Sequence, residues 1–182
     1  MIGFRQCDPR FPYLWDGSSQ PAGRWHAEGE GPAHYFADTP DGAWAELLRH
    51  EEITDPADLA TVRRAIWAVD LGDAPAVRVD VPADSLDGRL PGSAFEVCQA
   101  AARRARAAGQ QRLDVPSAAL LPGGARGRRV DGRGDTSPRD GRLLVVFGDP
   151  RELTWQGWPA AQAGAPSPDL LPRIRRYAST RG

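Results

Sequence analysis

The segment Leu143–Phe147 consists of five consecutive apolar residues, Leu-Leu-Val-Val-Phe. A strand with one solvent-exposed face alternates apolar and polar side chains, so an unbroken apolar run of this length is typical of a strand buried on both faces. The chain is therefore expected to form a sheet in which this strand has packed layers on either side.

Weaker patterns around this run predict the other elements of a mixed fold. Segments rich in Val, Ile and aromatic residues favour strands, and they lie at 33–37, 65–71, 76–81 and 112–115, with 153–155 as one more. Thr39, Pro40 and Asp41 supply a cap, a first-turn proline and a first-turn acid, which predict a helix at 40–50. A second helix is expected at 93–109, where a glycine provides the stop. The fold class we predict is α+β.

Three stretches lack such patterns. Residues 1–32 are rich in Gly, Pro and charge, which favours loops and short strands. Residues 122–141 consist mainly of Gly, Arg and Asp, so burial cannot offset their ordering entropy and a mobile loop is expected. From about residue 160 the chain is rich in Pro and Ala, and a loosely ordered C-terminal tail is expected. The length of 182 residues and the absence of repeats indicate a single domain over residues 1–182.

The charge balance excludes several classes of function. A net charge of -1 and a pI near 6.3 give no global attraction to nucleic acid or to an anionic membrane. All 23 basic residues are Arg, which rules out a Lys nucleophile, a Schiff-base Lys and a phosphate-loop Lys. No segment resembles a signal peptide or a membrane span, and Cys7 and Cys98 have neither metal-binding nor redox spacing. We therefore expect a cytoplasmic protein.

The most specific pattern combines a turn, a strand, a helix and a distant serine. Gly23-Arg24-Trp25 precedes a strand segment with Tyr35, a helix with Glu46 and, well downstream, the step Pro116-Ser117. This order and spacing resemble the RES-domain family, in which a Gly-Arg-Trp turn leads into a Tyr-bearing strand, a Glu-bearing helix and a Pro-Ser step. The resemblance covers roughly residues 5–155.

That resemblance implies a fold and a chemistry. The fold would be related to the ADP-ribosyltransferases, with a split and strongly twisted β-sheet core and flanking helices. NAD would be the substrate, and its nicotinamide-ribose bond would be broken by phosphorolysis or hydrolysis, with inorganic phosphate or water as acceptor. ADP-ribosyl transfer to a macromolecule is the variant left open. Several family members are toxins of toxin-antitoxin pairs, so an Xre-type antitoxin and a second copy of the chain are the implied protein partners.

The resemblance also implies residue roles. Arg24, Glu46 and Ser117 would be the catalytic residues, and Arg24, Trp25, Tyr35 and Ser117 would bind NAD. Arg24 would contact the nicotinamide-ribose side or the phosphates, Tyr35 and Trp25 would flank the nicotinamide, and Glu46 would serve the reacting ribose. Ser117 would hydrogen-bond the dinucleotide.

General chemistry supports these roles independently. Breaking an N-glycosidic bond develops positive charge on the ribose, so a fixed carboxylate such as that of Glu46 stabilises the transition state more than the ground state. The guanidinium of Arg24 can donate two parallel hydrogen bonds to a diphosphate. The aromatic face of Tyr35 can stack on a cationic nicotinamide ring.

Each role has a structural alternative. Glu46 lies off the apolar stripe of its helix, which is typical of a solvated residue paired with Arg49 or His50. Arg24 would then satisfy loop carbonyls, the two aromatic residues would belong to the core or a lid, and the serine would be a helix N-cap.

Other classes of function have weaker patterns. His26, His34 and His50 are too irregularly spaced for a metal motif, so no metal is predicted. A Ser-His-Asp hydrolase built on Ser117 would lack the Gly-x-Ser-x-Gly elbow. A binding module could dock the Arg-rich segment 126–142 on nucleic acid, but that segment has no interleaved aromatic residues for base stacking.

Overall fold

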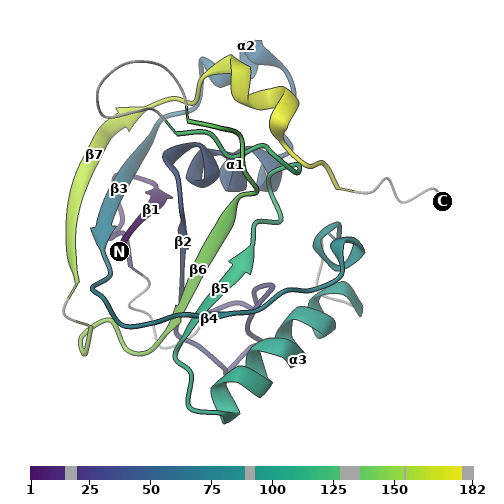
Figure 1. Ribbon diagram of the computed structural model, residues 1–182. Coiled ribbons are helices and arrows are strands. Elements are labelled where there is room, and N and C mark those ends of the chain that lie inside the picture. Colours follow the sequence, from purple (N-terminus) through teal and green to yellow (C-terminus); the bar gives the residue numbers. More distant parts are fainter. Residues whose placement is uncertain (15–19, 89–92, 128–135, 154, 178–182) are drawn as a thin grey trace.

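The structure is a computed structural model that describes residues 1–14, 20–88, 93–127, 136–153 and 155–177. Its described part contains one sheet in the strand order β4-β5-β6-β2-β1-β3-β7, with β7 at one outer edge (Figure 1). Neighbouring strands are antiparallel except for the parallel pair β4 and β5. The α+β fold class predicted from the sequence is thereby confirmed.

The strands carry most of the fold. Their bounds are β1 Ile2–Cys7, β2 Ala33–Ala37, β3 Arg64–Asp70, β4 Val77–Arg78, β5 Arg112–Pro116, β6 Arg142–Phe147 and β7 Gln156–Gly164. The helices are α1 Pro40–His50, α2 Pro56–Leu59 and α3 Ser93–Ala107, with 3₁₀ turns η1 Ala83–Leu86 and η2 Pro168–Arg173.

Strand β6 is covered on both faces, as its apolar run predicts. Leu143, Val145 and Phe147 belong to the larger core, to which α1, α3 and η2 also contribute. Leu144 and Val146 belong to a smaller core on the opposite face, where loop residues supply the cover. The helices therefore gather over one face of the sheet, and the candidate site lies on that face.

Several predicted elements are confirmed with nearly the predicted bounds. β2 and α1 agree with the sequence patterns residue for residue, because strong local signals such as the Thr39 cap define them. The Thr39 side chain accepts a hydrogen bond from Gly42 N at 3.0 Å. α3, β3, β5 and β6 differ from their predicted bounds by one or two residues, which is the usual fraying of element ends.

Two strands differ from the sequence-based expectation. β4 pairs over only two residues, where six were expected. The last strand begins at Gln156 rather than covering 153–155. β7 contains mostly Gly, Ala and Pro, which are weak strand formers, so its conformation comes from pairing with β3 and not from local propensity. β1 pairs along its whole length with β3 and is a short strand of the kind expected in residues 1–32.

The two segments expected to be loosely ordered are packed where the structure describes them. In the segment 122–141, Ala125 is fully buried and exchanges two backbone hydrogen bonds with Arg139. Residues 128–135 of this segment, to which the mobile-loop prediction also applies, lie outside the described residues. In the tail, Leu170 and Ile174 are buried in the larger core.

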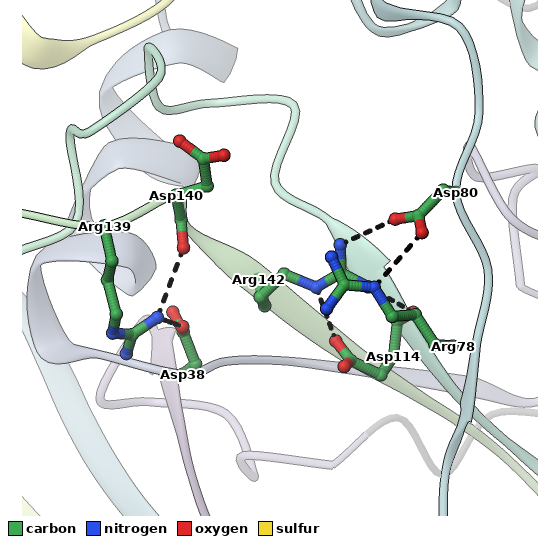
Figure 2. A network of polar contacts seen from close by, with 7 residues as sticks. All are labelled: Asp38, Arg78, Asp80, Asp114, Arg139, Asp140 and Arg142. Carbon is green, nitrogen blue, oxygen red and sulfur yellow. Dashed lines mark hydrogen bonds and ion pairs between the residues drawn. The ribbon is translucent and has the colours of Figure 1, made fainter.

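An ion-pair network fixes the start of β6. Figure 2 shows Arg142 between two acids: its Nε donates to Asp114 at 2.7 Å and its Nη1 to Asp80 at 3.0 Å. Nearby, Arg139 donates to Asp38 at the end of β2. The contacts of Arg142 tie the start of β6 to β5 and to the segment after β4, beside the Pro116-Ser117 step.

His34 on β2 predicts a pH-dependent stability. It is fully buried, its Nε2 donates to Gly148 O at 3.2 Å, and burial lowers its pKa from 6.5 to about 4. The unfolded chain therefore binds a proton at higher pH than the folded chain, so stability is lost as the pH falls from 6.5 toward 4, by roughly 3 kcal/mol. His34→Gln keeps an N–H donor for Gly148 but does not titrate.

We expect urea unfolding at pH values between about 7 and 4 to show a smaller loss of stability in His34→Gln than in the parent. Parallel losses in the two proteins would contradict a neutral buried His34.

Within the described ranges, no helix has the length and apolar character needed to cross a bilayer.

Candidate active site

The residues singled out by the sequence pattern meet at one hollow on the helix-covered face of the sheet. The hollow has a volume of about 390 Å³, and Arg24, Trp25, Tyr35 and Glu46 all line it. Ser117 contacts Glu46 at its edge. Residues from a turn, a strand, a helix and a distant loop are therefore brought together by the fold.

Glu46 lies on the flank of α1 between its buried stripe and the hollow. Its neighbours on the helix, Ala45 and Leu47, are buried, whereas Glu46 itself is half-buried. Burial raises the pKa of its carboxyl group, and the Arg49 guanidinium, the Ser117 hydroxyl and the Arg24 guanidinium oppose that rise. The alternative of a solvated surface glutamate does not hold.

Ser117 is oriented by the end of β5. Its backbone N donates to Gly141 O at 2.9 Å, and its Oγ accepts from Ala119 N at 3.1 Å. The hydroxyl proton is directed to Glu46 Oε1 at 3.1 Å. Ser117 is buried, so its hydroxyl both caps the following turn and holds the carboxylate in place.

Arg24 is held by two carbonyl groups and an aromatic ring. Its Nη1 donates to Ser85 O and its Nη2 to Gly88 O, each at 2.7 Å, and its guanidinium lies 4.5 Å from the centre of the Phe95 ring. Each terminal nitrogen of a guanidinium carries two protons, so a further donor remains on both. Arg24 thus satisfies loop carbonyls and keeps N–H groups for a ligand.

The two aromatic residues differ in how they line the hollow. Trp25 is 1% exposed and belongs to the core, and its Nε1 has no hydrogen-bond partner among the described residues. Tyr35 is half-buried, and its hydroxyl accepts from Trp25 N at 3.2 Å. Burial raises the pKa of Tyr35 far above its usual value, so the phenol stays neutral.

Comparison with known proteins assigns the chain to a family. A model of the RES domain matches residues 4–126, which is more than half of the chain. The chain belongs to the RES domain family. The matched span includes Arg24, Tyr35, Glu46 and Ser117. A comparison with curated proteins finds no match.

One solved structure has a similar fold. It is a chain of the crystal structure of the M. tuberculosis MbcT-MbcA toxin-antitoxin complex, with a TM-score of 0.57 and 17% sequence identity. The match covers 94% of this chain and 86% of that chain. At this identity the likeness concerns the fold alone, so the chain has the architecture of that chain.

The RES domain of this chain has further site residues that the sequence pattern did not single out. Arg49 is 3% exposed and donates to Ala118 O and, at 2.6 Å, to Leu86 O. Its guanidinium lies 4.5 Å from the centre of the Tyr177 ring, which also lines the hollow. Arg49 lies opposite the apolar stripe of α1, so the sequence pattern gave no signal for its burial. Tyr177 had no signal either, because it lies far beyond the motif.

A second hollow of about 220 Å³ adjoins the same carboxylate. It is lined by Tyr35, Glu46 and Leu143, which also line the larger hollow, and by Arg5 and Gln6 of β1. Within the described residues, Arg5 Nη1 and Gln6 Oε1 are buried without a hydrogen-bond partner. A buried polar atom without a partner is costly, so these two atoms are candidates for contact with a ligand.

Among the described residues, no group of three His, Cys, Asp or Glu side chains is arranged to hold a metal ion.

Proposed function

We propose that this RES domain consumes NAD by breaking the bond between nicotinamide and ribose, with inorganic phosphate or water as acceptor. The observation that carries the proposal is the position of Glu46, at the junction of two hollows and hydrogen-bonded by Ser117. A ribose bound at this junction would have a carboxylate at the carbon where positive charge develops.

The surroundings of Glu46 suit this task. Desolvation makes its charge more effective because few water molecules screen it. Ser117, Arg49 and Arg24 favour the ionised form that burial opposes. The carboxylate can therefore stabilise the positive charge that forms on the ribose only as the glycosidic bond breaks.

The charges of the larger hollow suit an anionic dinucleotide. Arg24 and Arg49 both line it, and within the described part of the chain Glu46 is the acidic residue among its lining residues. Guanidinium groups bind phosphates through parallel hydrogen bonds. Tyr35, Phe95 and Tyr177 provide aromatic surface for the nicotinamide or the adenine.

The direct test is to incubate the purified protein with NAD and to measure free nicotinamide, with and without added phosphate. We expect nicotinamide release, and a phosphorylated ADP-ribose product seen by phosphorus NMR would identify phosphate as acceptor. Release unaffected by phosphate, with plain ADP-ribose as product, would identify water. No release under any of these conditions would contradict the proposal.

We further propose a protein partner of the antitoxin type. The support is the fold shared with a chain of a toxin-antitoxin complex. The test is to coexpress the chain with a helix-turn-helix protein encoded by a neighbouring gene and to purify through a tag on that protein. A complex that no longer releases nicotinamide is the expected result, and a fully active complex or no complex would contradict this part.

A further inference from the structure

His26 directly follows the Gly-Arg-Trp turn and is enclosed between two oxygen atoms. It is 2% exposed, its Nε2 lies 3.0 Å from Pro21 O, and its Nδ1 lies 2.8 Å from the Tyr35 hydroxyl. It does not line either hollow at Glu46. Its contacts therefore concern Tyr35 and not a ligand.

The partners of His26 fix its tautomer. A carbonyl oxygen only accepts hydrogen bonds, so the ring proton of neutral His26 resides on Nε2 and is donated to Pro21. Nδ1 is then an acceptor, and the Tyr35 hydroxyl donates to it. The same hydroxyl accepts from Trp25 N. The Tyr35 hydroxyl thus uses its proton and one acceptor position in bonds directed away from the hollow. The Tyr35 ring lines the hollow.

The surrounding turn is built to keep this chain of hydrogen bonds in place. A Cβ atom on Gly23 would lie 2.6 Å from His26 Cε1 and 2.7 Å from the Tyr35 hydroxyl, so only glycine allows this approach. Gln99 of α3 donates from Nε2 to Gly23 O at 2.9 Å and to His26 O at 3.2 Å. Gly23 of the motif and Gln99 of α3 therefore both stabilise the contact between His26 and Tyr35.

We propose that His26 is a positioning residue that anchors Tyr35 in the orientation needed to bind NAD, and that only its neutral form does so. This inference rests on the proposed NAD-consuming function. A protonated ring would carry N–H groups on both nitrogens. The Nδ1–H of that ring would donate to the Tyr35 oxygen, so the hydroxyl proton would lose its acceptor and the phenol would turn from its present orientation to find another.

Burial, together with the charges around His26, sets the pH at which this ring is protonated. Burial lowers its pKa below 6.5, whereas the bond to Pro21 and the carboxylate of Glu30 raise it and Arg106 of α3 lowers it. Glu30 is itself paired with Arg103 at 3.1 Å. His26 is therefore neutral near pH 7, and the anchor is lost only on the acid side of 6.5.

Two variants separate the two hydrogen bonds of His26. His26→Asn places an amide oxygen close to the Nδ1 position, so it keeps an acceptor for Tyr35 and cannot titrate. His26→Gln places an amide near the Nε2 position, so it keeps the donor to Pro21 and loses the acceptor for Tyr35. Both variants remove the imidazole and each keeps one of the two bonds, so a KM that is raised in His26→Gln but not in His26→Asn assigns the effect to the bond to Tyr35.

The experiment measures KM for NAD and kcat as functions of pH. In the parent we expect KM to rise on the acid side of 6.5, and in His26→Asn we expect a KM near the parent value without that rise. In His26→Gln we expect KM to be raised about tenfold at every pH, with kcat less affected. Equal KM values for the two variants, or an unchanged acid rise in His26→Asn, would overturn the proposal.

A measurement independent of NAD separates this inference from the proposed function. Nitrogen-proton NMR correlations of the parent report the tautomer and titration of each of the three histidines, and His26→Asn assigns the His26 signals. A neutral Nε2–H tautomer that titrates below 6.5 is expected. A protein with this tautomer but no NAD consumption would refute the proposed function alone, whereas a protonated His26 at pH 7, or an Nδ1–H tautomer, would refute the anchor.

Discussion

Replacing Glu46 by Gln is expected to lower nicotinamide release about a hundredfold or more, which corresponds to roughly 3 kcal/mol at the transition state. The substitution keeps the size of the side chain and an acceptor for the Ser117 hydroxyl, but it removes the negative charge. Charge on the ribose develops only as the bond breaks, so turnover should fall much more than the affinity for NAD.

The stability of Glu46→Gln gives a second, opposite expectation. Burial raises the pKa of the Glu46 carboxyl. Above that pKa the carboxylate is charged in both states, but its charge is desolvated in the folded protein and hydrated in the unfolded chain. Removing the charge should leave the melting temperature at neutral pH unchanged or raise it, and this gain should vanish as the pH falls and the parent carboxyl becomes protonated.

The matched control for this prediction is Glu51→Gln. Glu51 is exposed and directly follows the same helix, so its replacement makes the same change of charge away from the hollows. Nicotinamide release at saturating NAD and melting curves are measured for the parent and both variants. Normal release by Glu46→Gln would remove Glu46 from the mechanism, and equal losses in the two variants would point to a general effect of charge.

The sequence predicted those parts of the fold and site that depend on local signals. α1 has a capping residue, a first-turn proline and a clear apolar stripe, and β6 has an unbroken apolar run. The motif residues Arg24, Tyr35 and Glu46 could be connected because each occupies a short segment with its own pattern. The structure places them at one hollow, and the roles that the family resemblance implies for them stay predictions.

The remaining features depend on contacts between distant segments. Nothing local in β7 favours a strand, and its pairing with β3 is a tertiary contact. Arg49 was interpreted as a surface partner of Glu46, but the carbonyls of Leu86 and Ala118 hold it in the interior. His26 was considered only as a metal ligand, because its hydrogen bond to Tyr35 joins residues on different elements.

The second large effect is expected for Arg24→Lys. A lysine ammonium keeps the positive charge but cannot bridge Ser85 O and Gly88 O while lying flat on the Phe95 ring. The loss of one part-buried charge-assisted hydrogen bond costs about 1.5–3 kcal/mol, which lowers the melting temperature by several degrees in a domain of this size. The remaining N–H groups for NAD are lost as well, so KM should rise about tenfold or more.

These two consequences are separated by a matched control and a binding measurement. Arg106 has the same kind of aromatic contact, 4.4 Å from the centre of the Phe147 ring, and does not line the hollow at Glu46. Arg106→Lys should therefore leave KM for NAD unchanged. Calorimetry with NAD in a Glu46→Gln background measures affinity without turnover, at a temperature well below the melting temperature of each variant. If adding Arg24→Lys to that background leaves the affinity unchanged, Arg24 only clamps η1 to the Gly-Arg-Trp turn; a weaker affinity that Arg106→Lys does not reproduce assigns it to the dinucleotide.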